Sequence, residues 1–104
     1  MTIRSPVVNT VSGAICGQEA RGILSFKGIP YARPPEGRLR FQPPLPPRPW
    51  KEVRPATTAG PVPVQAAIPV LRFLNAGGAR QAEDCLYLNV QTPGLEGKKR
   101  PVFV

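Results

Sequence analysis

Two acidic residues and a cysteine, Glu83, Asp84 and Cys85, stand directly before an apolar stretch and are the side chains of this 104-residue chain best placed for chemistry. Charged groups at the start of a strand need partners or water. Neighbouring residues of a strand point to opposite faces, so the two carboxylates are not a ready acid–base pair. An ordinary edge strand with a solvated acidic start explains the same three residues without any chemistry.

The side chains that hydrolytic or metal chemistry needs are missing from the sequence. It contains no histidine and no Gly-x-Ser-x-Gly stretch, and Ser5, Ser12 and Ser25 stand in ordinary strand or terminal contexts. Nucleophilic ester hydrolysis would need a serine on such a turn, a histidine base and an acid that orients it. Two cysteines without histidine give no zinc-ligand spacing, and no glycine-rich loop matches a phosphate cradle. We therefore predict no catalytic, cofactor or metal site in these 104 residues.

A strand is predicted directly after the acidic residues. Apolar side chains of one face alternate there with aromatic or polar side chains of the other, namely Leu86, Leu88 and Val90 against Tyr87, Asn89 and Gln91. A period of two over such residues indicates a half-buried strand. Pro93 and Gly94 then end it.

The second signature of the type-B carboxylesterases is similar to the stretch Glu83-Asp84-Cys85-Leu86-Tyr87-Leu88-Asn89-Val90, followed here by Pro93. That family includes the cholinesterases, the mammalian carboxylesterases and the bacterial para-nitrobenzyl esterases. Further stretches resemble the family in the same order, namely Phe26–Ala32, Pro34–Gly37, Leu39–Phe41 and the lone Trp50. The resemblance covers roughly Val8 to Val104, and an eight-residue match with ordered companions is a specific signal.

The resemblance implies an α/β fold in which this chain is the N-terminal fragment of an α/β-hydrolase, itself mostly β-strand and proline-rich loop. Residues 1–104 would then be part of a single carboxylesterase domain, truncated before the oxyanion loop and the nucleophile elbow. The full enzyme would cleave small-molecule esters through a serine acyl-enzyme, and the partner of this fragment would be the remainder of the domain. Val102–Val104 are expected to begin a further strand, inside which the chain stops.

The resemblance also implies two structural roles for the acidic stretch. In the family the arginine of the Leu-Arg-Phe segment pairs with the glutamate of the signature, which here means Arg40 with Glu83. A bidentate bond of this kind would hold an irregular loop. The cysteine at the position of Cys85 pairs in animal members with one upstream, but residues 60–65 contain none. We therefore expect Cys16 and Cys85 to be free, buried thiols in a reducing compartment.

Two alternative functions follow from composition. The net charge of +8 is compatible with a nucleic-acid binder. The arginines are, however, dispersed among prolines, and only Lys98-Lys99-Arg100 form a cluster, so we predict no nucleic-acid partner. Residues 43–48 also fit a Pro-x-x-Pro-x-Arg ligand, which would make the chain a small proline-rich interaction module; a stiff spacer over a neighbouring surface is the plainer interpretation.

The rest of the chain is expected to form strands at its start and an irregular layer in its middle. Val7–Ile15 and Ile23–Phe26 are predicted to pair as an antiparallel hairpin, with a bulge or close approach at Gly28 and an end at Pro30. Twelve prolines within residues 30–69 exclude a long helix there, and Leu39, Phe41 and Trp50 are the expected anchors of that segment. Residues 68–75 are predicted to form a short helical turn.

Neither a secretory leader nor a membrane span is predicted. Residues 1–6 include one charged side chain and no apolar region of the kind that signal peptides contain. No window approaches the roughly 18 apolar residues of a membrane span. We therefore expect a cytoplasmic protein without a membrane partner.

Overall fold

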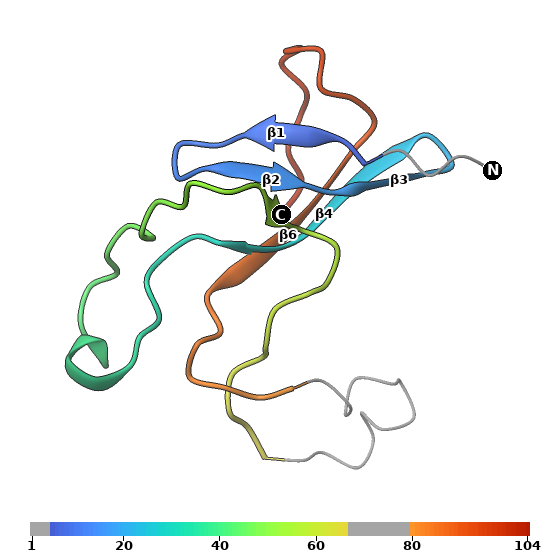
Figure 1. Ribbon diagram of the computed structural model, residues 1–104. Coiled ribbons are helices and arrows are strands. Elements are labelled where there is room, and N and C mark those ends of the chain that lie inside the picture. The colour runs from blue at the N-terminus through green and yellow to red at the C-terminus, as the bar shows by residue number, and fades with distance from the viewer. Residues whose placement is uncertain (1–4, 67–79) are drawn as a thin grey trace.

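The computed structural model describes residues 5–66 and 80–104, and most of its regular structure is short β-strand (Figure 1). Within these residues there is one turn of 3₁₀ helix and no α-helix. The elements in chain order are β1 (Val7–Asn9), β2 (Ala14–Cys16), β3 (Gln18–Ala20), β4 (Ile23–Pro30), η1 (Gly37–Leu39), β5 (Arg54–Pro55) and β6 (Tyr87–Thr92).

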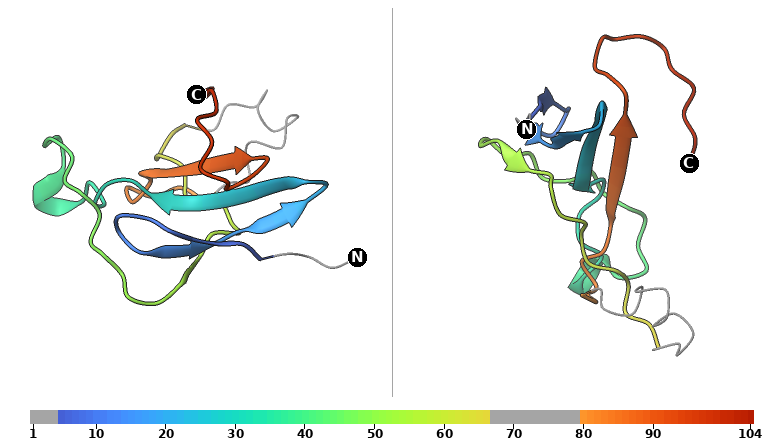
Figure 2. Two further views of the ribbon diagram at one scale, coloured as in Figure 1. Left: turned by 90° about the horizontal axis from the view of Figure 1, so that it is seen from above. Right: turned by 90° about the vertical axis from the view of Figure 1, so that its right-hand side faces the viewer.

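The strands form two three-stranded sheets (Figure 2). The first has the order β1-β2-β5, with β1 antiparallel and β5 parallel to β2. The second has the order β3-β4-β6 and is antiparallel throughout. Only Gly17 separates β2 from β3, so the chain passes from one sheet to the other at this residue. A side chain at Gly17 would meet the carbonyl oxygen of Ser25 at 2.4 Å, which explains why this buried crossing is a glycine.

The predicted pairing of Val7–Ile15 with Ile23–Phe26 is wrong in detail. A turn splits the first run, because the Thr10 hydroxyl donates to the Gly13 carbonyl oxygen at 2.6 Å and the Gly13 backbone N–H donates back to the Thr10 carbonyl oxygen at 3.2 Å. This turn makes a hairpin of β1 and β2. On its N-terminal side β4 pairs with β3, which lies in the segment that was expected only to connect two strands.

Gly28 marks an irregularity in the pairing of β4 with β6, as expected. The register shifts between Phe26 and Ile29, and Gly28 has a φ of 73°. A Cβ atom at this position would lie 2.4 Å from the carbonyl oxygen of Thr58. The freed Gly28 N–H donates to the Asn89 side-chain oxygen at 3.0 Å. The predictions that β4 ends at Pro30 and that a strand follows the acidic residues are also confirmed.

The proline-rich segment is irregular, and one of its three expected anchors is clearly wrong. Trp50 packs against the core, and its indole N–H donates to the Ala14 carbonyl oxygen at 2.8 Å. Leu39 is half-buried. Phe41 is 96% exposed and adopts a φ of 59°, a left-handed backbone conformation that turns its ring into solvent.

The core lies between the two sheets and is small. It consists of Ile15, Leu24, Phe26 and Ala56, with Val8, Ile29 and Trp50 packed against it. Ala56 joins the sheets, because its N–H donates to the Cys16 carbonyl oxygen at 2.7 Å and its own carbonyl oxygen accepts from the Lys27 N–H at 2.8 Å. Its 1% exposure leaves no room for a larger side chain.

The chain exposes much more surface than a compact domain of its mass. Its accessible area is 8657 Å², whereas about 5,700 Å² is expected for a folded monomer of this mass. Its radius of gyration is 15.7 Å, against about 13 Å for a compact domain of this length. The excess of about 3,000 Å² on this one chain is larger than the roughly 1,000–2,500 Å² that each partner contributes to most large obligate interfaces.

Val102–Val104 do not form the strand that was predicted for them. Their side chains are 85–112% exposed and no strand of the described residues pairs with them. A strand needs a neighbour for its backbone groups, and an apolar run without one stays irregular. The helical turn predicted for residues 68–75 lies outside the described residues.

None of the helical structure described for residues 5–66 and 80–104 is long and apolar enough to span a membrane.

Replacing Gly28 with alanine should destabilise the fold more than replacing Gly22. Both glycines have a left-handed φ, 73° and 78°, but only Gly28 faces a neighbouring atom. Gly22→Ala should therefore cost about 1–2 kcal/mol for the backbone conformation alone. Gly28→Ala should cost about 1–3 kcal/mol more, because the Thr58 carbonyl must move. Urea unfolding of the two variants measures the difference, and equal losses would contradict the close approach at Gly28.

Candidate functional site

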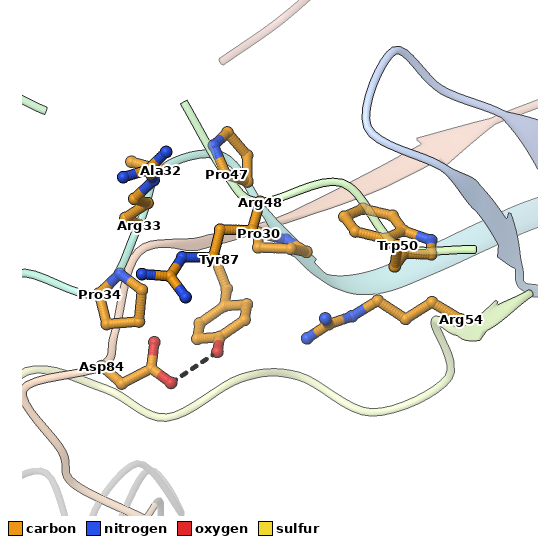
Figure 3. Close-up of a pocket in the computed structure, with 10 residues that line it drawn as sticks. All are labelled: Pro30, Ala32, Arg33, Pro34, Pro47, Arg48, Trp50, Arg54, Asp84 and Tyr87. Carbon is orange, nitrogen blue, oxygen red and sulfur yellow. Dashed lines mark hydrogen bonds between the residues drawn. The ribbon is translucent and has the colours of Figure 1, made fainter. Parts of the chain in front are cut away.

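Three segments that are distant in the sequence meet at the start of β6. They are the end of β4 with the residues after it, the chain around Trp50 and Arg54, and the acidic stretch before Tyr87 (Figure 3). Glu83, Asp84 and Cys85 lie outside β6, which begins at Tyr87. Their side chains are therefore directed by a loop rather than by the alternation of a strand.

Arg40 and Glu83 form the predicted ion pair. Arg40 Nε lies 3.1 Å from Glu83 Oε1, and the two side chains are 55% and 46% exposed. The contact is a single Nε–Oε1 approach rather than the expected bidentate bond. The Arg40 guanidinium also lies 5.6 Å from the centroid of the exposed Phe41 ring. Because both charges remain in contact with water, we expect a modest contribution to stability, and the role of the pair as a clamp stays a prediction.

Asp84 binds the first residue of the following strand β6, and no ion pair joins it to a basic residue of the described part of the chain. The Tyr87 hydroxyl donates to Asp84 Oδ2 at 2.9 Å (Figure 3). The Tyr87 N–H also donates to the Cys85 carbonyl oxygen at 3.0 Å, so a tight turn brings the acid back over the ring. Burial raises the pKa of Tyr87 above its ordinary value of 10.0, and the hydrogen bond and negative charge of Asp84 raise it further.

Arg54 lies on the other side of the Tyr87 hydroxyl and connects it to the N-terminal sheet. Its positive charge and hydrogen bond act against the other influences and lower the pKa of Tyr87. The same guanidinium lies 5.4 Å from the centroid of the Trp50 ring, a cation–π distance. Since Trp50 is bound to Ala14 in β2, a continuous set of contacts runs from the acidic stretch to the first sheet.

Tyr87 and Arg54 were not predicted as members of this site. The period of two marks Tyr87 only as a residue on the face opposite Leu86, and Arg54 is one of several arginines that precede a proline. An aspartate three residues before a tyrosine was the one available signal, because a turn between them allows a hydrogen bond.

Both cysteines are unpaired, and both are half-buried rather than buried as expected. The Cys16 thiol lies near backbone carbonyls, 3.7 Å from the oxygen of Ser5. Cys85 lines a hollow of about 270 Å³ together with Arg40, Phe41 and Glu83. Among the described residues there is no group of three potential metal ligands. The arrangement can hold segments together through charge and hydrogen bonds, and contains no nucleophile with a histidine base.

Comparison with known proteins identifies the family. The model of the carboxylesterase family matches residues 4–104. The chain is 41% identical to the para-nitrobenzyl esterase of Bacillus subtilis over 98 residues, which covers 94% of this chain and 20% of that protein. It is 40% identical to carboxylesterase 1D of Rattus norvegicus over 114 residues, covering 95% and 20%. The chain therefore belongs to the carboxylesterase family.

Solved structures agree with this assignment and define the fold class. A PNB esterase superposes with a TM-score of 0.81 at 41% identity, covering 89% of this chain and 19% of that one. A carboxylesterase from Geobacillus stearothermophilus gives a TM-score of 0.75 at 44% identity, covering 91% and 18%. Both are α/β-hydrolase esterases, so the expected fold class is confirmed. The chain spans about a fifth of the length of these relatives.

The two alternative functions receive no support from these comparisons. The matched relatives are esterases by name. The basic cluster at residues 98–100 is also partly neutralised, since Arg100 Nη2 lies 2.6 Å from Glu96 Oε2. In the proline run, the Leu45 and Pro46 carbonyl oxygens accept from Arg33, so this stretch is bound to its own chain.

A double-mutant cycle on Arg40 and Glu83 should give a coupling free energy of about 0.2–1 kcal/mol, as for other exposed ion pairs. Arg40→Ala, Glu83→Ala and the double variant form the cycle, measured by urea unfolding. Arg38→Ala combined with Glu83→Ala is the matched control, because Arg38 is exposed on η1 and belongs to neither ion pair described. A coupling of about 3 kcal/mol or more would contradict this prediction and indicate a buried clamp.

The phenol of Tyr87 should titrate above pH 10. Because the chain has two tyrosines, the difference between the ultraviolet pH titrations of the wild type and Tyr87→Phe isolates this group. Asp84→Asn should lower the pKa, since it removes a negative charge beside the hydroxyl. The folded chain holds the proton more tightly than the unfolded chain, so this stabilisation is complete below pH 10 and is lost as the pH rises through the folded pKa. No change in the Asp84→Asn variant would refute the assigned cause.

Proposed function

We propose that this chain forms the N-terminal portion of a serine carboxylic ester hydrolase that acts on small-molecule esters. The observation that carries the proposal is the match to the carboxylesterase family over residues 4–104. In this proposal the serine nucleophile, the histidine base and the orienting acid belong to the remainder of the domain, because these 104 residues contain no histidine. Ester cleavage proceeds there through an acyl-enzyme that water hydrolyses.

The contribution of this chain to such an enzyme is structural. The large excess of accessible surface, with exposed Phe41, Val102, Phe103 and Val104, supports a surface that the remainder of the domain covers. The acidic stretch and its partners hold the proline-rich segment against the sheets from which the rest of the domain would continue. The chain would therefore position neighbouring elements and would not itself contact the reacting ester bond.

We also propose that the enzyme works in a reducing compartment such as the cytoplasm. Cys16 and Cys85 are both unpaired in the structure. Half-buried free thiols persist where glutathione and thioredoxin keep cysteines reduced. Neither nucleic acid nor a membrane is part of this proposal.

A graft tests the proposal. Residues 4–104 would replace the matching segment of the Bacillus subtilis para-nitrobenzyl esterase, which is 41% identical to them. We expect the graft to hydrolyse a p-nitrophenyl ester within about tenfold of the parent, a loss of about 1.4 kcal/mol in transition-state stabilisation. The isolated 104-residue chain, assayed beside it, should show no saturable turnover.

Two outcomes would argue against this function. One is a soluble graft with the circular dichroism spectrum of the parent but without activity. The other is saturable ester hydrolysis by the isolated chain, because it would require catalytic groups that the proposal places elsewhere.

A further inference from the structure

A cavity of about 180 Å³ lies between the three segments that meet at the start of β6, and arginines dominate its charge (Figure 3). Arg33, Arg48 and Arg54 line it, against a single carboxylate, that of Asp84. Asp84 Oδ2 is already occupied by the Tyr87 hydroxyl. Within residues 5–66 and 80–104, none of the three arginines lies within 4.0 Å of a carboxylate oxygen. The lining therefore has a formal charge of +2 without neutralisation by ion pairs.

The backbone of each of the three arginines is restricted by its local sequence. Each of them directly precedes a proline, at positions 34, 49 and 55. A following proline restricts the backbone of the residue before it to extended conformations, which fixes the direction in which each side chain leaves the chain. Arg33 is held further because its Nε donates to the Pro46 carbonyl oxygen at 3.1 Å. The Arg54 guanidinium lies over the Trp50 ring. Arg48 reaches toward the cavity beside Tyr87 (Figure 3).

The walls of the cavity limit the chemistry of what it can hold. Trp50, Tyr87 and several prolines give it apolar sides, which a bare inorganic anion would leave without contacts. A cavity of about 150 Å³ accommodates a benzene molecule, so 180 Å³ has room for one ring or a short acyl body. Nucleotides and drug-sized ligands need about 300 Å³ or more. The guanidinium fork matches the geometry of a carboxylate.

We propose that this cavity binds a small carboxylate with a compact apolar body. Arg48 and Arg54 hold the carboxylate, and the rings of Trp50 and Tyr87 contact the apolar part. This site goes beyond ester hydrolysis and does not depend on it, because every group that forms it lies in this chain. The Asp84 charge disfavours a second anion and restricts the site to a single carboxylate.

The test is a titration of the 104-residue chain with benzoate, followed by the indole N–H signal of Trp50 in NMR spectra. Trp50 is the one tryptophan of the sequence and lines the cavity, so its signal reports binding there. We expect saturable benzoate binding that weakens at least about tenfold in the Arg48→Gln/Arg54→Gln variant, because charge-assisted hydrogen bonds are lost. Benzamide, which has the same shape without the charge, should bind at least about tenfold more weakly to the wild type.

The control variant Arg38→Gln/Lys99→Gln removes the same charge from exposed residues that do not line the cavity, and should bind benzoate like the wild type. Arg48→Lys keeps the charge without the fork, and should weaken binding in a chain whose spectrum stays dispersed even if the double variant unfolds. The proposal is overturned if benzoate does not saturate, if phosphate or benzamide binds equally well, if the control loses as much affinity as the cavity variant, or if Arg48→Lys leaves the affinity unchanged.

Discussion

The pairing of β4 with β6 is the interaction on which the rest of the structure depends. The two strands are separated by the 56 residues between Pro30 and Tyr87, so their hydrogen bonds close a long and largely irregular loop. Closing a flexible loop of this length costs about 3–4 kcal/mol beyond a constant. The backbone hydrogen bonds between β4 and β6 offset this cost together with the contacts around them. Asn89 binds the bulge at Gly28, Trp50 binds β2, and Ala56 connects the two sheets by hydrogen bonds on both of its sides.

Charged side chains add contacts between segments that the small core does not join. The buried core is a cluster of four residues with three partners. The proline-rich segment has few ladder bonds of its own, because proline lacks an N–H group. Arginine side chains take over part of this work: the Arg33 guanidinium donates to the Pro46 carbonyl oxygen, Arg40 pairs with Glu83, and the Arg54 guanidinium lies over the Trp50 ring. Part of the positive charge of the chain thus serves structural contacts.

Sequence patterns correctly located β6 and the irregularity and end of β4. The alternation at residues 86–91 located β6 to within one residue, and Gly28 and Pro30 marked the bulge and the end of β4. The Arg40–Glu83 contact came from family resemblance rather than from spacing. Sequence patterns missed β3, the polar stretch at residues 18–20, although only Arg21 and Gly22 separate it from its partner β4. They also failed where a distant partner decides the outcome, as for Phe41, an expected anchor that faces solvent.

The polar contacts of the site could not be predicted for the same reason. Nothing in the sequence places Trp50, Arg54 and Tyr87 together, since β2, the proline run and β6 first have to meet. By contrast, the lack of a histidine base follows from the residue types alone. The family assignment then supplied the fold class that this strand-rich portion alone would not define.

The position of β6 as the outermost strand of its sheet has a consequence for the behaviour of the isolated polypeptide in solution. Its outward N–H and carbonyl groups form a template on which another copy could add a strand, and its Leu88 and Val90 side chains are 39% and 41% exposed. Mutual repulsion between molecules of charge +8 opposes this association. Dissolved salt screens that repulsion over about 10 Å at 0.1 M. A higher ionic strength should therefore favour association through this edge.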